Sequence, residues 1–185
     1  QRVSTPILCE LQQNHKEMRK TLLKFIVCTA HIVFPLMFLI FILSDSLIVI
    51  LLTDKWLKSS IILKILAPVG LLFVINTFNL NVFNATGKTG LALKNEVYKK
   101  LIFFIILICS IQFGFLYVIA SQIIISIIEI IFNTYYTKIQ IKLKPTDQFM
   151  ALRGVLVSCL IMSIIVYFVL LNFESHFIKF FLGSF

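Results

Sequence analysis

The chain has 185 residues, 59% of them hydrophobic, and its mean hydropathy of +1.01 leaves too little polar surface for a soluble protein. Its net charge of +9 comes from 17 Lys and Arg against 8 Asp and Glu. Most of these cations lie between apolar runs or at their ends, whereas a nucleic-acid footprint clusters on one folded face. The four cysteines lack the paired spacing of a metal or redox site. We expect an integral membrane protein that binds no nucleic acid.

Five apolar runs predict helices that cross the membrane. About 20 apolar residues, rising roughly 1.5 Å each, cross a hydrocarbon core of about 30 Å. Lipid offers the backbone no hydrogen-bonding partner, so each run must satisfy its own amides as a helix. The predicted spans are residues 22–43, 60–83, 101–119, 122–136 and 152–171.

The segments between these runs are predicted to be short helices or loops. Ser44 and Asp45 are expected to cap a separate short helix at residues 47–52, and residues 85–100 read as a long loop. The third and fourth spans follow each other closely enough to form a tight hairpin. Residues 177–185 are apolar but too short to cross, so they predict only a partial sixth span.

Positive charge alternates in density along the chain. Cations crowd the residues before the first span, between the second and third, and between the fourth and fifth, which predicts that these segments are cytoplasmic. We divide the chain into a cytoplasmic connector, four spans, and a last part with the final cytoplasmic loop, the fifth span and the partial sixth. These parts are residues 1–21, 22–141 and 142–185. We expect them to be a fragment of a longer polytopic protein.

A polar stripe runs along the fourth predicted span. Its members are spaced by 4, 3 and 4 residues, which places them on one face of a helix: Gln122, Ser126, Glu129 and Asn133. Because a charge near the middle of the bilayer is expensive, Glu129 must face protein or water. It either lines a hydrophilic translocation path with a role in proton or cation coupling, or joins helices by hydrogen bonds.

Three further groups of polar residues lie in the first two spans. His31 sits near the middle of the first span and is a second candidate for the path, or a histidine satisfied locally. Asn76 and Asn79 share a helical face near the end of the second span, where a structural role is favoured over substrate contact. Lys64 either extends its charge to the interface or attracts a phosphate.

Short motifs follow one another in a characteristic order through residues 1–100. Pro6 and a cation-rich connector precede a span that contains Pro35, and Asp45 comes next. The later motifs are residues 53–56 (TDKW), 62–72 (ILKILAPVGLL) and 84–89 (NATGKT). This order resembles the second half of the Wzx-type polysaccharide and O-antigen flippases, in the superfamily of multidrug, oligosaccharidyl-lipid and polysaccharide exporters. Many relatives carry Gly-Glu where this chain has Thr53-Asp54.

The resemblance implies an all-α polytopic transmembrane helical bundle, with five full spans plus a partial sixth, that forms the second lobe of a two-lobed transporter. Such a transporter moves a polyprenyl-pyrophosphate-linked oligosaccharide across the bacterial cytoplasmic (inner) membrane by alternating access. It implies no enzymatic activity and no cofactor. The implied partners are the lipid-linked substrate, membrane lipid and an N-terminal lobe of the same protein. An inward-facing cationic cavity is expected for the pyrophosphate.

Two other functions remain open. A cation-coupled small-molecule antiporter of the same superfamily would use an acidic cavity, for which Glu129 is the best support. A membrane-embedded glycan polymerase or acyltransferase would need a large outer loop with Arg or His, and the longest outer segment, residues 44–59, has neither. Residues 82–89 end like a phosphate-binding loop but lack its first glycine.

Overall fold

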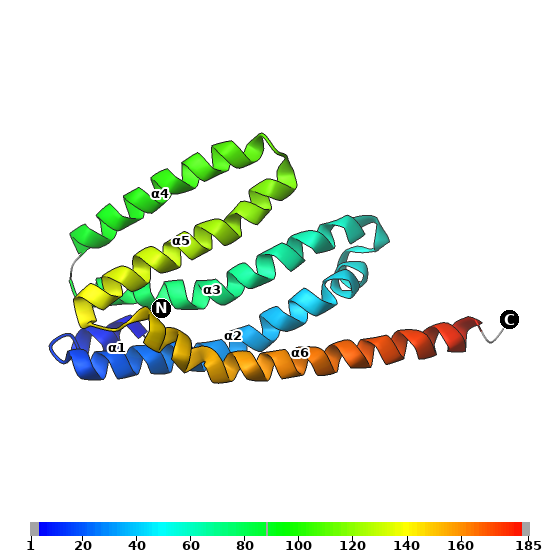
Figure 1. The fold of residues 1–185 in the computed structure, drawn as a ribbon, viewed down its shortest axis with the longest axis horizontal. Coiled ribbons are helices and arrows are strands. Elements are labelled where there is room, and N and C mark those ends of the chain that lie inside the picture. The colour runs from blue at the N-terminus through cyan, green and yellow to red at the C-terminus, as the bar shows by residue number, and fades with distance from the viewer. Residues whose placement is uncertain (1–3, 88, 183–185) are drawn as a thin grey trace.

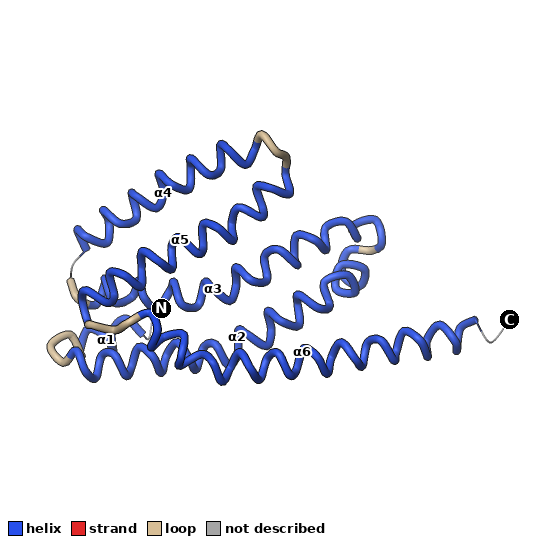
Figure 2. Tube along the Cα trace, in the orientation of Figure 1, coloured by secondary structure: helices blue, strands red, loops and turns tan. Residues whose placement is uncertain are grey.

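The computed structural model describes residues 4–87 and 89–182, without the side chains of residues 89, 91, 92 and 171–182. Every regular element in that part of the chain is helical (Figure 2). The elements are α1 (Ser4–Glu10), α2 (His15–Leu52), the 3₁₀ helix η1 (Asp54–Ser59), α3 (Ser60–Ala85), α4 (Thr89–Ile111), α5 (Phe115–Ile141) and α6 (Pro145–Leu182). The all-α prediction is confirmed.

Four helical segments are long and apolar enough to cross a membrane: α2, η1 with α3, α5 and α6. The predicted third span, residues 101–119, is wrong in its bounds. Helix α4 ends at Ile111, and Gly114 adopts a φ of 108° that is strained for residues with a side chain. A turn therefore breaks the apolar run, and its last residues open α5. Hydropathy cannot register this break, because the residues on both sides of the turn are equally apolar.

Three other boundaries also differ from expectation. The expected short helix at residues 47–52 is the last part of α2, whose final residue is Leu52. The next residue, Thr53, caps the helix with a φ of 77°. The expected loop at residues 85–100 is largely the first half of α4. The expected partial sixth span is not a separate helix, because α6 continues without a break to Leu182. Residues 183–185 of that expected span lie outside the described residues.

Consecutive long helices run in opposite directions, so their connections collect at two ends of the bundle (Figure 1). We call one the α1 end, where α1, the start of α2 and the α3–α4 and α5–α6 connections lie. The other is the η1 end, with η1 and the α4–α5 turn. The α1 end gathers the three cation-rich segments, which agrees with the alternation of charge in the sequence.

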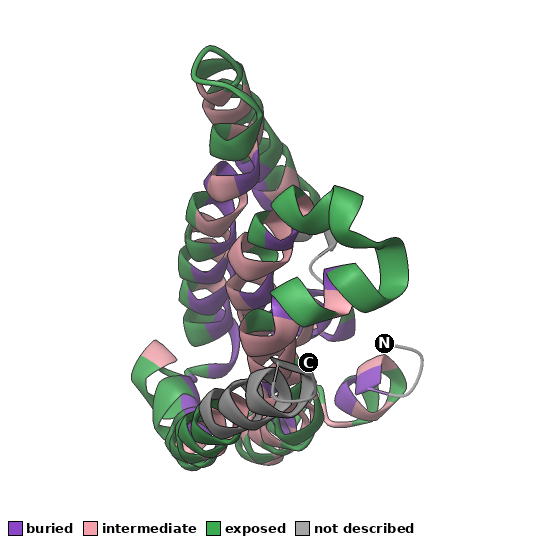
Figure 3. Cartoon of the chain, turned by 90° about the vertical axis from the view of Figure 1, so that its right-hand side faces the viewer, coloured by how far each residue is buried: buried purple, intermediate pink, exposed green. Residues whose placement is uncertain are grey.

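The apolar core lies toward the α1 end. Leu22 and Ile26 of α2 pack with Val74 of α3, Ile130 of α5 and Leu152 of α6, and each is at most 7% exposed. Along α3 most of the buried residues lie in its second half, toward this end. Many apolar side chains elsewhere are exposed, which is the pattern expected for helices in contact with lipid. Exposed residues are coloured green on the ribbon of Figure 3.

Candidate functional site

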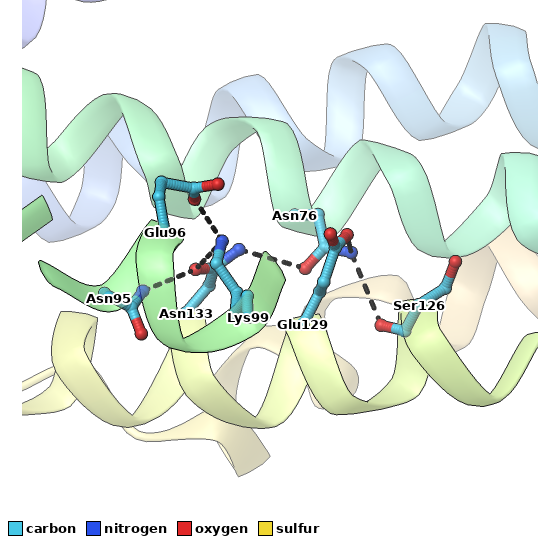
Figure 4. A network of polar contacts seen from close by, with 7 residues as sticks. All are labelled: Asn76, Asn95, Glu96, Lys99, Ser126, Glu129 and Asn133. Carbon is cyan, nitrogen blue, oxygen red and sulfur yellow. Dashed lines mark hydrogen bonds and ion pairs between the residues drawn. The ribbon is translucent and has the colours of Figure 1, made fainter. Parts of the chain in front are cut away.

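Seven polar residues from three helices meet in one group, which we call the α3–α4–α5 cluster (Figure 4). Helix α3 contributes one member and the other two helices contribute three each. The members are Asn76; Asn95, Glu96 and Lys99; and Ser126, Glu129 and Asn133. The spacing within α4 and within α5 is helical, so each helix presents its members on one face.

Two asparagines connect an ammonium to a carboxylate through this cluster. The Lys99 Nζ donates to Oδ1 of Asn133 at 3.2 Å, and Nδ2 of Asn133 donates to Oδ1 of Asn76 at 3.3 Å. The Nδ2 of Asn76 then donates to Oε2 of Glu129 at 3.3 Å. An ammonium can only donate and an ionised carboxylate can only accept, so the two ends fix the direction of both amides.

The cluster is buried at its centre and contains one more acidic side chain than basic ones. Lys99 is 5% exposed and Asn133 is 2% exposed, whereas Glu96 and Glu129 are half-buried. Lys99 forms an ion pair with Glu96 one turn away on α4. Since one ammonium faces two carboxylates, the cluster has a formal charge of −1 when all three are ionised. Low surrounding polarity makes that excess charge felt strongly.

The predicted stripe on α5 is a real face of the helix. Ser126, Glu129 and Asn133 all contact Asn76, since the backbone carbonyl of Ser126 accepts from Asn76 at 3.4 Å and the other two bond through side chains. Gln122 is half-buried and takes no part in the bonds of the cluster. Ile125, which lies outside the stripe, is also buried, so the interior face of α5 is wider than the stripe.

The structure separates the other asparagines from the cluster. Asn79 exchanges two hydrogen bonds with Gln148 of α6, at 2.8 and 3.0 Å, and both side chains are fully buried. Asn81 donates to Ser4 of α1 at 3.1 Å. Asn76 and Asn79, one turn apart on α3, therefore bond different helices, α5 and α6. Both Asn79 and Asn81 join elements at the α1 end. For Asn79 this is consistent with the structural role that the sequence favours.

Lys64 and His31 also lie apart from the cluster. The Nζ of Lys64 is 2.6 Å from Oδ2 of Asp45, whose other carboxylate oxygen accepts from Ser60, so Lys64 joins α3 to α2 near the η1 end. His31 is exposed on α2, and its Nδ1 lies 2.8 Å from the carbonyl oxygen of Val27. Neither residue is brought to Glu129 by the fold of the described residues.

The sequence interpretation missed the contribution of α4. Asn95, Glu96 and Lys99 were assigned to a loop because their segment is polar, although Asn95 and Lys99 have the i, i+4 spacing of one helical face. Gln148 was likewise placed in a loop. Its partner lies 69 residues earlier in the chain, a separation that no local pattern reveals.

Four membrane-length helical segments, two of which share a buried polar cluster with α4, define a multi-pass helical membrane protein. A family model described as "Polysaccharide biosynthesis protein" matches residues 1–61. The chain is also 29% identical over 177 residues to the teichuronic acid biosynthesis protein TuaB of Bacillus subtilis, which covers 95% of this chain and 36% of that protein. These two findings confirm the resemblance to membrane proteins of polysaccharide biosynthesis.

The chain thus spans about a third of the length of the curated relative it matches. No solved structure matches it. The family model ends before the α3–α4–α5 cluster begins, so the match to TuaB is what relates the cluster-bearing helices to a polysaccharide-biosynthesis protein.

Proposed function

We propose that this chain is part of a flippase that moves a lipid-linked oligosaccharide across the bacterial cytoplasmic membrane. The observation that carries the proposal is the similarity to TuaB over 95% of the chain. By analogy, the cargo is an intermediate of a surface polysaccharide, such as an O-antigen or a teichuronic-acid-like polymer, on a polyprenyl pyrophosphate carrier. The role is transport, without covalent chemistry on the glycan.

The α3–α4–α5 cluster supports such a role. A glycan that crosses a membrane needs polar partners in place of the water it leaves, and those partners must lie between helices. The cluster provides such groups between α3, α4 and α5. The charged ones are Lys99 and Glu129, and the neutral ones are the two bridging amides. Alternating access would require this unit to move against an N-terminal lobe.

The substitution Glu129→Gln tests the role of the cluster in transport. Gln keeps an oxygen that accepts from Asn76 but removes the charge, so the helices stay joined. We expect export to fall while the amount of inserted protein holds. The measurement is surface polysaccharide per unit of inserted protein. The host strain lacks the gene for this protein and expresses the variant as the full-length protein that contains this chain. Wild-type export would show that Glu129 only packs.

The control for that experiment is Asp45→Asn, which removes one carboxylate from an exposed ion pair far from the cluster. It makes the same change of charge on another helix, and we expect export to stay near wild type. Equal losses for both variants would mean that net charge alone, and not the cluster, governs export.

Cysteine labelling tests the proposed orientation. Residues 55, 94 and 144 carry exposed lysines, and the bundle places position 55 at the η1 end and position 144 at the α1 end. In a cysteine-free background, an impermeant thiol reagent added outside should label a cysteine at 55 and spare those at 94 and 144. Labelling at 94 would reverse the orientation.

A fragment experiment tests the need for a second lobe. Residues 1–185 expressed alone should insert but should not restore surface polysaccharide, because alternating access requires a second body to move against. Restoration by this fragment would contradict the two-lobe proposal and identify an independent membrane protein.

A cation-coupled small-molecule antiporter is the second candidate, and the formal charge of −1 at the cluster favours it. An antiporter predicts that the full-length protein makes cells resistant to cationic dyes. This resistance should be lost when the cation gradient across the membrane is removed. The flippase predicts no such resistance and a block in surface polysaccharide when the gene is deleted.

A further inference from the structure

A pocket of about 130 Å³ opens beside the α3–α4–α5 cluster. Its volume is several times the roughly 30 Å³ that one water occupies in the liquid, so it suits one ring-sized ligand and no larger oligomer. Its walls combine apolar side chains of α3 with the charged members of the cluster. The lining residues are Phe73, Asn76, Thr77, Leu80, Glu96, Lys99, Glu129 and Asn133.

The nitrogen donors that line this pocket are bonded within the cluster, whereas one of its acceptors remains available to a ligand. The amide nitrogens of Asn76 and Asn133 already donate within the cluster, and the Lys99 ammonium is engaged by Asn133 and Glu96. At Glu129, by contrast, the bond from Asn76 reaches Oε2, which leaves the second carboxylate oxygen as an acceptor. The pocket therefore has acceptors to offer and an excess negative charge. A matching ligand brings donors and no negative charge.

We infer that this pocket binds a neutral or amino-bearing sugar ring of the cargo and excludes its anionic groups. Hydroxyl pairs of a sugar donate to the Glu129 carboxylate, and the apolar face of the ring packs on Phe73. A pyrophosphate or a uronate placed here would face Glu96 and Glu129 with only Lys99 to offset them. The expectation of a cationic cavity for pyrophosphate is thus not met by this pocket. The inference rests on the proposed function and specifies its sugar-binding part.

Saturation-transfer NMR on the full coding-region product in nanodiscs tests this charge selectivity. The probes are D-glucose, D-glucosamine and D-glucuronate at matched concentration and ionic strength. We expect glucosamine and glucose to bind, and glucuronate to bind at least about tenfold more weakly, which corresponds to about 1.4 kcal/mol. Glucuronate binding as well as or better than glucose would overturn the inference, and so would the absence of binding by all three sugars.

Two variants link the selectivity to the pocket. Glu129→Gln and Glu96→Gln each bring the formal charge of the cluster to zero, so each should reduce the preference against glucuronate to about twofold or less. Either one suffices should the other fail to insert. Asp45→Asn is the matched control and should leave the preference unchanged. Selectivity that survives both Gln variants would place the sugar elsewhere and overturn the assignment.

Two further measurements separate this inference from its alternatives. Replacing choline chloride with sodium chloride should leave glucose binding unchanged, whereas loss of the glucose signal on adding sodium would identify a cation site and overturn the sugar assignment. Flipping of the lipid-linked oligosaccharide is measured on the same preparation. If flipping is active but the sugars do not bind in the expected order, with glucuronate weakest, the assignment of the pocket is refuted and the transport proposal stands. Sugar binding without flipping refutes the transport proposal and leaves the pocket standing.

Discussion

The α1 end and the η1 end of this bundle are held together by different chemistry. At the α1 end, buried amides and hydroxyls join helices that are distant in sequence, as in Asn79 with Gln148 and Thr86 with Gln140 at 2.8 Å. The η1 end instead has the ion pair between Asp45 and Lys64, whose side chains are 54% and 38% exposed. The apolar core also lies toward the α1 end.

This difference indicates where the molecule can move. Hydrogen bonds between buried amides are directional and leave costly unpaired groups when broken, so they hold helices in one arrangement. Apolar contacts and an exposed ion pair tolerate sliding much better. We expect the helices at the α1 end to move as one body, and the α2–η1–α3 hairpin and the α4–α5 turn to change position more readily.

The largest effect is expected from Lys99→Met, which removes the buried charge at the α1-end side of the cluster. Glu96 and Asn133 would lose a partner, and since breaking a fully buried ion pair costs about 3 kcal/mol, the half-buried Glu96 sets that figure as the upper end of the expected loss. Thermal unfolding in detergent, followed by size-exclusion chromatography, should show a clearly lower midpoint. Lys100→Met is the matched control, because Lys100 is exposed on the next position of α4. A midpoint equal to that control would contradict the buried network.

A smaller effect is expected from Asn79→Leu. The substitution leaves the Gln148 amide buried without its partner, at a cost of about 1–3 kcal/mol. The double variant Asn79→Leu with Gln148→Leu removes both polar groups and should recover much of that loss. The same unfolding midpoint measures both. Additive losses in the double variant would show that the two amides do not act as a pair.

The sequence predicts the helices that hydropathy defines and the face that spacing defines. The second span was expected at residues 60–83 and is α3, Ser60–Ala85, because an uninterrupted apolar run in lipid has no alternative to a helix. The spacing of Ser126, Glu129 and Asn133 correctly places them on one face, which meets Asn76. Both results depend only on local sequence, the span on hydropathy and the face on spacing.

The remaining features depend on information that no local pattern contains. Gly114 ends an apolar run through its backbone conformation, which hydropathy does not measure. Helix α4 begins with a polar segment, and its residues become interior only because Asn133 and the rest of α5 cover them. Lys99 is the clearest case, since a lysine in a polar stretch is ordinarily solvent-exposed and here its partner lies 34 residues away.

The smallest effect on global stability is expected from Asp45→Asn, although its local effect should be the clearest test of the comparison between the two ends. An exposed ion pair contributes at most about 1 kcal/mol, so the unfolding midpoint should barely change. The hairpin that the pair joins should nevertheless open more often, since Asp45 also accepts from Ser60 at the start of α3. Hydrogen–deuterium exchange should therefore quicken in η1 and stay unchanged around Asn79. Faster exchange at both ends would mean that the bundle opens as a single unit, and the two ends would not differ as the structure indicates.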